Sequence, residues 1–144
     1  MIEIRDRVRN VALRDKIVSA EEAASIIKPG MNIGTSGFTP AGYPKAVPLA
    51  LAARMKENPF KINLWTGASV GKELDGALAE VKGIQKRFPY QTNDSLRKQI
   101  NSGEVDYVDM HLSEVGQLTR YGFMGHLDVA IVEACAITEE GHII

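Results

Sequence analysis

Short apolar runs alternate with longer amphipathic stretches along this chain, and glycine, proline and small polar residues separate them. Apolar runs rich in β-branched residues are typical of strands, whereas longer stretches with helical periodicity are typical of helices. The pattern predicts strands over 32–36, 62–66, 105–110 and 129–137, and helices over 45–56, 72–81, 94–101 and 113–121. This alternation indicates an α/β fold with a mostly parallel sheet and flanking helices.

Cap residues predict where the helices begin and end. Ser19 and Glu22 have the spacing of a capping box, which predicts a first helix that closes at Pro29 and Gly30. Pro48 would clash with the preceding turn, so the helix over 45–56 either kinks or starts late. The other expected N-caps are Asn93 and Ser113, and the other expected C-terminal stops are Gly103 and Gly122.

Composition narrows the class of protein. The 144 residues are enough for one packed domain, with 44% hydrophobic and 24% charged residues. Seventeen basic and eighteen acidic residues give a net charge of −1, so a nucleic-acid-binding footprint is not expected. No apolar run reaches the length of a membrane span, and the charged N-terminus lacks the apolar core of a signal sequence. With a single cysteine, Cys135, a reducing cytoplasmic location is expected.

The stretch from Gly34 to Lys45 is the most distinctive in the chain, because glycines and hydroxyl residues crowd a predicted strand-to-helix turn. Glycines let backbone N–H groups approach a ligand closely, and the following helix adds the positive end of its dipole. Hydroxyls of Ser36, Thr39 and Tyr43 and the Lys45 cation surround the turn. We expect a small anionic or carbonyl ligand here, bound by Ser36, Gly37, Phe38, Thr39, Ala41 and Gly42.

Other interpretations of this loop are weaker. Gly37 and Gly42 have the glycine spacing of a phosphate-binding P-loop, but Tyr43-Pro44 stands where that motif needs Lys-Ser/Thr. The glycines also lack the spacing of a dinucleotide-binding fingerprint. The remaining alternative is a purely structural loop, in which the glycines allow the chain to turn and bind no ligand.

Two further polar segments follow predicted strands. Ser69 is flanked by small residues, which suits a hydrogen bond to a carboxylate, although it could instead cap the helix over 72–81. Because ligands gather at the carboxyl ends of parallel strands, its loop should neighbour the glycine loop. Thr92 is the third candidate, with the alternative that it merely precedes the Asn93 cap.

Ionisable residues offer few catalytic candidates. His111 is expected to be structural, while His126 and His142 fall in predicted turns and should be exposed. Without clustered cysteine and histidine ligands, no metal site is expected. Glu133 lies in an apolar run and should form a buried ion pair. The segment Lys86-Arg87 could meet the phosphates of coenzyme A, with a solvated turn as the favoured alternative.

These segments together resemble the acetyl-CoA hydrolase/transferase family, which includes succinyl-CoA:acetate CoA-transferases. The resemblance rests on the glycine loop and on four more strings in order, Trp65–Gly71, Pro89–Asn93, Asp109–Ser113 and Asp128–Glu133, the last of which leads into Ala136–Gly141. It implies the NagB/RpiA/CoA-transferase type of fold, with residues 1–144 as the N-terminal domain of a two-domain enzyme. It also implies that Ser69 and Thr92 lie in or near the acyl or carboxylate pocket.

In that family a glutamate of the C-terminal half forms a glutamyl-CoA thioester, and no match to its motif occurs here. The resemblance therefore implies that this chain alone is inactive and that the catalytic domain follows it. An apolar run that only begins at Ile143 agrees with a longer polypeptide. The expected partners are acyl-CoA, small carboxylates and that C-terminal domain, in a homodimer, with coenzyme A as substrate and no bound cofactor. The alternatives are an acetyl-CoA hydrolase and a stand-alone, non-catalytic ligand-binding domain.

Overall fold

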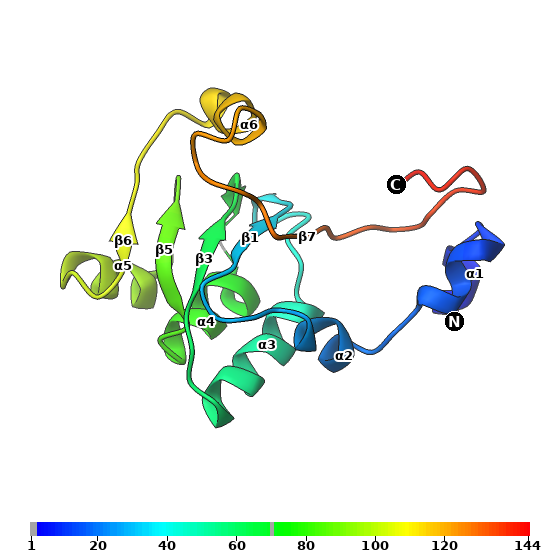
Figure 1. Ribbon diagram of the computed structural model, residues 1–144, viewed down its shortest axis with the longest axis horizontal. Helices are drawn as coiled ribbons and strands as arrows, with labels where there is room; N and C mark the ends of the chain where they lie inside the picture. The colour runs from blue at the N-terminus through cyan, green and yellow to red at the C-terminus, as the bar shows by residue number, and fades with distance from the viewer. Residues whose placement is uncertain (1–2, 70) are drawn as a thin grey trace.

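A parallel β-sheet forms the centre of the molecule. The computed structural model describes residues 3–69 and 71–144. Within these residues, five parallel strands lie side by side in the order β6-β5-β3-β1-β7 (Figure 1). Their bounds are Asn32–Thr35 for β1, Ile62–Trp65 for β3, Ile84–Phe88 for β5, Asp106–Tyr107 for β6 and Val129–Ile131 for β7. The predicted α/β class is confirmed.

Helices cover one face of this sheet. They are α2 (Ala20–Ser25), α3 (Ala46–Glu57), the π-helical turn η2 (Lys72–Gly76), α4 (Ala77–Glu80) and α5 (Asp94–Asn101). Alternate strand residues such as Ile33 and Leu64, which are partners in register, turn toward these helices and are almost fully buried. Helix residues such as Leu51 and Leu78 complete the same apolar core. In Figure 1, α6 (Leu112–Arg120) instead lies beyond the carboxyl ends of the strands.

The predicted helix starts are confirmed at two positions and corrected at one. Ser19 Oγ accepts a hydrogen bond from the backbone N–H of Glu22 at 3.1 Å. Asn93 Oδ1 caps α5 by accepting from the Leu96 N–H at 3.0 Å. The prediction for Ser113 is wrong, because α6 begins at Leu112 after the N-cap residue His111, with no side-chain cap.

The helix over 45–56 starts late rather than kinking. It begins at Ala46, so Pro48 falls in its first turn. Backbone N–H groups of a first turn have no partner within the helix, and the missing N–H of proline therefore costs little there. At the other ends, Gly103 and Gly122 follow α5 and α6 with φ values of +78° and +76°, as expected of helix-terminating glycines.

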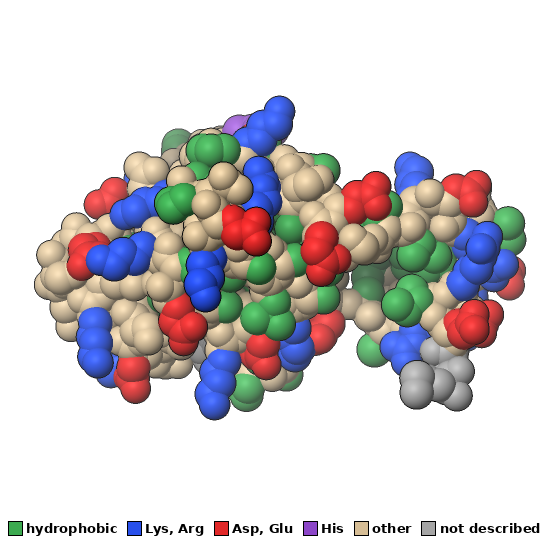
Figure 2. Space-filling model, turned by 90° about the horizontal axis from the view of Figure 1, so that it is seen from below, with side chains coloured by type: hydrophobic (Ala, Val, Ile, Leu, Met, Phe, Trp, Pro, Cys, Tyr) green, Lys and Arg blue, Asp and Glu red, His purple; other side chains and the backbone are tan. Residues whose placement is uncertain are grey.

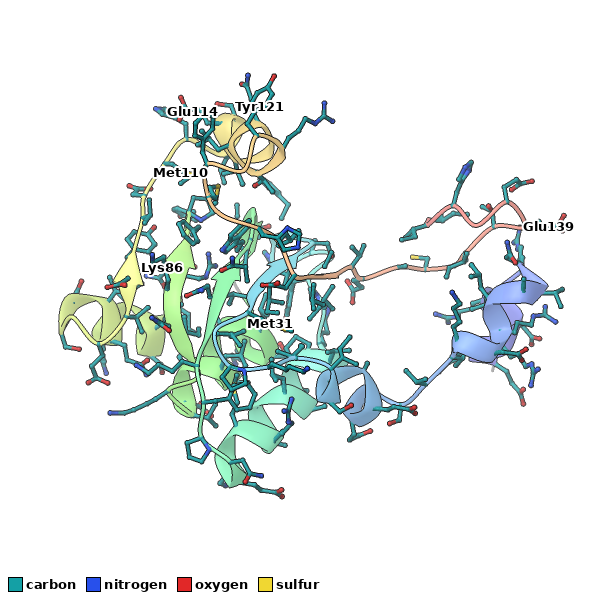
Figure 3. The ribbon with its side chains drawn as sticks, viewed as in Figure 1. Met31, Lys86, Met110, Glu114, Tyr121 and Glu139 are labelled. Atoms are coloured by element: carbon teal, nitrogen blue, oxygen red, sulfur yellow. The ribbon has the colours of Figure 1, made fainter. Side chains whose placement is uncertain are left out.

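Strand β5 corrects the interpretation of Lys86-Arg87 as a solvated turn or a phosphate contact. Both residues lie within this strand, which the sequence pattern did not predict. The Arg87 side chain is completely buried and forms an ion pair with Asp75 of η2. It is therefore not available to the phosphates of coenzyme A. Lys86, labelled in Figure 3, is partly exposed.

The two strands at the sheet edges are shorter than predicted. The run over 105–110 contributes only β6, and the run over 129–137 contributes only β7. The Ser36 N–H donates to the Ile131 carbonyl at 3.0 Å, and the next residues then leave the sheet. Glu133 turns toward the glycine loop instead, and the exposed Cys135 lies beyond it.

The two ends of the described chain pack on each other in a small terminal lobe. Helix α1 (Ile4–Arg7) and the 3₁₀ helix η1 (Val11–Lys16) meet residues 134–144, and backbone bonds of 2.9 Å join Ile137 to Arg7 and Arg9. Figure 2 shows this lobe set apart from the main body. In the part of the chain that is described, no helix is both long and apolar enough to cross a membrane.

Candidate functional site

The two glycine-containing loops pair with each other at the carboxyl ends of β1 and β3. Strand β2 (Phe38–Thr39) of the first loop runs parallel to β4 (Ala68–Ser69) of the second. The backbones are close enough that a Cβ added to Gly67 would lie 3.3 Å from the Gly37 carbonyl oxygen. The prediction that these loops are neighbours is confirmed.

The glycine loop is tightly folded and carries an exposed aromatic side chain. Gly37 has a φ of +121° and Gly42 a φ of +69°, which residues with a Cβ rarely adopt. Phe38 and Ala41 exchange two backbone hydrogen bonds of 2.9 and 3.1 Å. The Phe38 side chain is 67% exposed, and Thr39 and Ala41 are exposed beside it. The loop therefore presents a short, exposed surface above the sheet.

Ser36 closes this loop. Its hydroxyl donates to the Gly42 carbonyl at 2.7 Å and accepts from the Glu133 backbone N–H at 2.9 Å. Because the hydroxyl proton is committed to Gly42, the main effect of Ser36 is to fix the loop's shape and to tie it to the segment after β7. A ligand would find at Ser36 an oxygen acceptor rather than a free donor.

A polar network surrounds the base of the loop. The Tyr43 hydroxyl donates to Glu73 Oε2 at 2.5 Å, while Lys45 Nζ lies 2.6 Å from Glu133 Oε1 and 4.2 Å from the centre of the Tyr43 ring. Glu133 thus has the expected ion-pair partner, but its side chain is 41% exposed rather than buried. The carboxylate of Glu73 raises the pKa of Tyr43, and the hydrogen bond from Tyr43 lowers the pKa of Glu73.

Removing the Glu73 charge should therefore lower the pKa of Tyr43. We expect Glu73→Gln to shift the ionisation of the Tyr43 phenol to lower pH, because the neutral amide no longer disfavours the phenolate. Absorbance titration of the variant, with Tyr43→Phe used to subtract the other tyrosines, measures this shift. An unchanged Tyr43 titration would show that the Tyr43–Glu73 hydrogen bond does not persist in solution.

The third candidate segment begins at the carboxyl end of β5, next to β3. The Thr66 N–H donates to the Phe88 carbonyl at 3.1 Å, which places the ends of these strands side by side. Thr92 is exposed, and its carbonyl accepts from Arg97 Nη2 at 3.0 Å. The role of its side chain stays a prediction.

The Ser69 side chain lies outside the described residues, although its backbone belongs to β4. The N-cap residue of the following π-helical turn is Gly71. The alternative that Ser69 is the N-cap of that helix is therefore wrong, and the Ser69 hydroxyl remains a candidate for ligand binding.

A largely apolar cleft of about 320 Å³ lies beside the paired loops. Trp65 and Ala130 of the sheet line it together with Val115 and Thr119 of α6 and with Leu127. A Cβ at Gly34 would lie 3.0 Å from Leu127 Cδ1, so glycine makes room for this packing. The volume of this cleft is at the lower end of the range for small-molecule sites. Sequence reasoning missed this cleft, and the only signal was the helical spacing of Val115 and Thr119.

The histidines lie outside this arrangement. His126 and His142 are exposed as predicted, and His111 is exposed too, at the start of α6. Across residues 3–69 and 71–144, no three histidine, cysteine or acidic side chains come together in a way that could hold a metal ion. The candidate site is therefore the set of strand-end loops.

Gly71 packs directly against the ring of Tyr43, so a side chain there should be destabilising. A Cβ at this position would lie 2.2 Å from Tyr43 Cε2, and the ring is buried. We expect Gly71→Ala to lower the free energy of unfolding by about 1–3 kcal/mol, as overpacking does. Gly116→Ala is the matched control, because nothing lies within 4 Å and the position is helical. The control should be stabilising by about 0.5–1 kcal/mol. Equal unfolding midpoints for the two variants would contradict the Tyr43 contact.

Sequence and structure comparisons relate this chain to known proteins. The family model for the acetyl-CoA hydrolase/transferase N-terminal domain matches residues 1–144 of the sequence. A succinyl-CoA:acetate CoA-transferase of Clostridium kluyveri is 49% identical, with 96% of this chain aligned to 26% of that protein. A propanoyl-CoA:succinate CoA transferase of Escherichia coli is 47% identical over 88% of the chain and 27% of its own length. An acetyl-CoA hydrolase of Yarrowia lipolytica is 37% identical, with 98% of this chain aligned to 30% of that protein.

The chain thus spans between a quarter and a third of the length of these relatives. Among solved structures, RipA has a TM-score of 0.63 at 20% identity, covering 91% of this chain and 30% of its own. The decarboxylase AibA/AibB has a TM-score of 0.56, also at 20% identity, covering 74% of this chain and 43% of its own. At this identity the structural likeness concerns the fold.

Proposed function

Because this chain belongs to the acetyl-CoA hydrolase/transferase family, we propose that it is the N-terminal domain of an enzyme that moves CoA between an acyl-CoA and a small carboxylate. The observation that carries this proposal is the pairing of β2 with β4. It joins the glycine loop to the loop of Ser69, so two polar loops can act on one substrate group. Ligands of open parallel sheets bind at this end of the strands.

In this proposal, the loops hold the acyl group or the carboxylate. The residues assigned to this role are Ser36, Gly37, Phe38, Thr39, Ala41, Gly42, Ser69 and Thr92. The glycines allow close approach of the backbone, and Ser69 and Thr92 supply hydroxyl groups to a carboxylate or thioester oxygen. Ser36 contributes by holding the loop closed through Gly42.

The covalent steps are assigned to a glutamate outside residues 1–144. Its carboxylate oxygen attacks the thioester carbonyl and releases the CoA thiolate, which leaves an acyl-glutamyl anhydride. The thiolate then attacks the glutamyl carbonyl, so that the donor carboxylate departs and a glutamyl-CoA thioester forms. The acceptor carboxylate repeats these steps in reverse. Glu133 is already bound to Lys45, which suits a role in holding the loop rather than in this attack.

Hydrolysis of acetyl-CoA is the second candidate, favoured by relatives that carry that name, such as the protein of Yarrowia lipolytica. The complete protein should be incubated with acetyl-CoA, with and without succinate. A transferase forms succinyl-CoA and acetate only when succinate is present. A hydrolase releases free CoA even without succinate. If neither succinyl-CoA nor free CoA forms, the result would favour a non-catalytic binding domain.

Removing the Ser69 hydroxyl should weaken use of the acceptor carboxylate. We expect Ser69→Ala in the complete enzyme to cost about 1 kcal/mol, or roughly a fivefold higher KM for the acceptor, because one donor is lost. Ser25→Ala is the control, since the Ser25 hydroxyl donates to the Glu22 carbonyl of its own helix, away from the loops. A change in unfolding midpoint with unchanged kinetic constants would show that Ser69 is structural.

A further inference from the structure

Asp75 and Arg87 form an ion pair in the interior of the domain. Arg87 Nε lies 2.9 Å from Asp75 Oδ1 and Arg87 Nη2 lies 3.0 Å from Oδ2, so the guanidinium binds the carboxylate with two parallel hydrogen bonds. Both side chains are completely buried. The geometry of this pair is thus fixed in both distance and angle.

The pair lies where two strand-end loops leave the sheet. Asp75 belongs to the π-helical turn η2, which follows the loop of Ser69, and single π-turns frequently occur at functional sites. Arg87 is followed by Phe88, the last residue of β5, and by the segment of Thr92. The ion pair therefore connects the end of one candidate loop to the start of another.

Arg87 also reaches the end of β3. Its Nη1 donates to the Phe88 carbonyl, and this same oxygen accepts the Thr66 N–H at 3.1 Å. Thr66 immediately precedes the loop that contains β4. One guanidinium thus organises the points at which β3, β5 and η2 meet the substrate loops.

Stability alone does not account for this arrangement. Removing two charges from water costs several kcal/mol for each ion, and well-packed apolar residues of similar volume often replace a buried pair without loss of stability. An apolar pair, however, cannot reproduce two directed hydrogen bonds to a carboxylate and a third to a backbone carbonyl. What the ion pair supplies beyond packing is a defined relative position of the loops.

We infer that Asp75 and Arg87 are positioning residues for substrate binding, which hold the loop of Ser69 and the segment of Thr92 at the spacing that the carboxylate requires. This inference rests on the proposed function. Neither side chain touches substrate, since both are buried beneath the loops.

The test is the double variant Asp75→Leu/Arg87→Met in the complete enzyme, which replaces the pair by apolar residues of similar size. We expect a thermal midpoint close to that of the unchanged enzyme. Backbone amide exchange in residues 66–69 and 89–93 should be about tenfold faster, and kcat/KM for the acceptor should fall at least about tenfold, mainly through KM. The matched control is Lys82→Met/Glu104→Leu, which removes an exposed ion pair of 3.0 Å and should leave all three readouts unchanged.

Unchanged exchange and kinetics in a folded double variant would overturn the inference. If the double variant fails to fold, Arg87→Lys, which keeps the charge but loses the two-pronged geometry, provides the same readouts. Failure of both to fold would assign the pair to folding and also overturn the positioning role. If the unchanged enzyme transfers no CoA, the proposed function fails, while the exchange measurement still decides whether the pair orders the loops.

Discussion

Replacing Arg87 alone by methionine is expected to lower the free energy of unfolding by about 3–5 kcal/mol, because the Asp75 carboxylate is then left buried without its partner. Burial already raises the pKa of Asp75, and the guanidinium opposes this shift. Without Arg87 the carboxyl should therefore take up a proton more readily. Denaturant unfolding of the variant and the unchanged protein measures the difference.

Lys86→Met is the matched control. Lys86 is next to Arg87 in β5 and pairs in register with Asn63, whereas Arg87 pairs with the buried Leu64. The control should change stability by no more than about 0.5 kcal/mol, as is usual for surface substitutions. Similar effects of the two substitutions would contradict the burial of Arg87 in an ion pair with Asp75.

The second large effect is expected at Gly37, in the complete enzyme. Its φ of +121° is accessible to glycine but strained for valine, and its carbonyl lies against Gly67 of the second loop. Gly37→Val should displace the paired loops, and a displacement of about 1 Å can reduce activity about 100-fold. We expect a loss of this size in kcat/KM for CoA transfer.

Ser25→Val provides the comparison, because Ser25 is exposed in α2 and remote from the loops. It introduces the same side chain and should leave kcat/KM within about threefold, as expected of a surface change worth about 0.5 kcal/mol. Equal activity of the two variants would show that the conformation of the glycine loop is not needed for function.

Much of the fold could be predicted from local pattern. The helix over 94–101 has the predicted bounds, since Asn93 caps it and Gly103 follows it. The central strands β1 and β3 also lie within their predicted ranges, and the residues by which they face the helices, such as Ile33 and Leu64, are buried. The edge strands β6 and β7 are shorter than their runs. Each has a single neighbour in the sheet, and β7 ends at Ile131, opposite Thr35, the last residue of β1.

Strand β5 could not be predicted in this way. Its residues 85–87 are polar, and Arg87 becomes buried only because Asp75, twelve residues earlier, neutralises it. No local hydrophobic pattern contains that information. An arginine is expected at the surface unless a partner is known.

In the candidate site, too, some features could be predicted from the sequence and others could not. The rule that strand ends gather at one edge of a parallel sheet predicted that the loops of Gly37 and Ser69 meet, and β2 and β4 confirm it. The cleft beside α6 forms where Leu127, Val115 and Trp65 come together from separate segments, which only the tertiary structure shows. The cytoplasmic location and the homodimer stay predictions.

The central claim is that this chain positions the substrate while a glutamate outside it carries the CoA. The direct measurement is to incubate the complete enzyme with acetyl-CoA, trap the covalent CoA adduct, and locate it by peptide mass spectrometry. We predict an adduct on a glutamate beyond residues 1–144 and none on this chain, which alone should neither hydrolyse acetyl-CoA nor transfer its CoA. An adduct on Glu133, or on any other carboxylate within residues 1–144, would contradict the account.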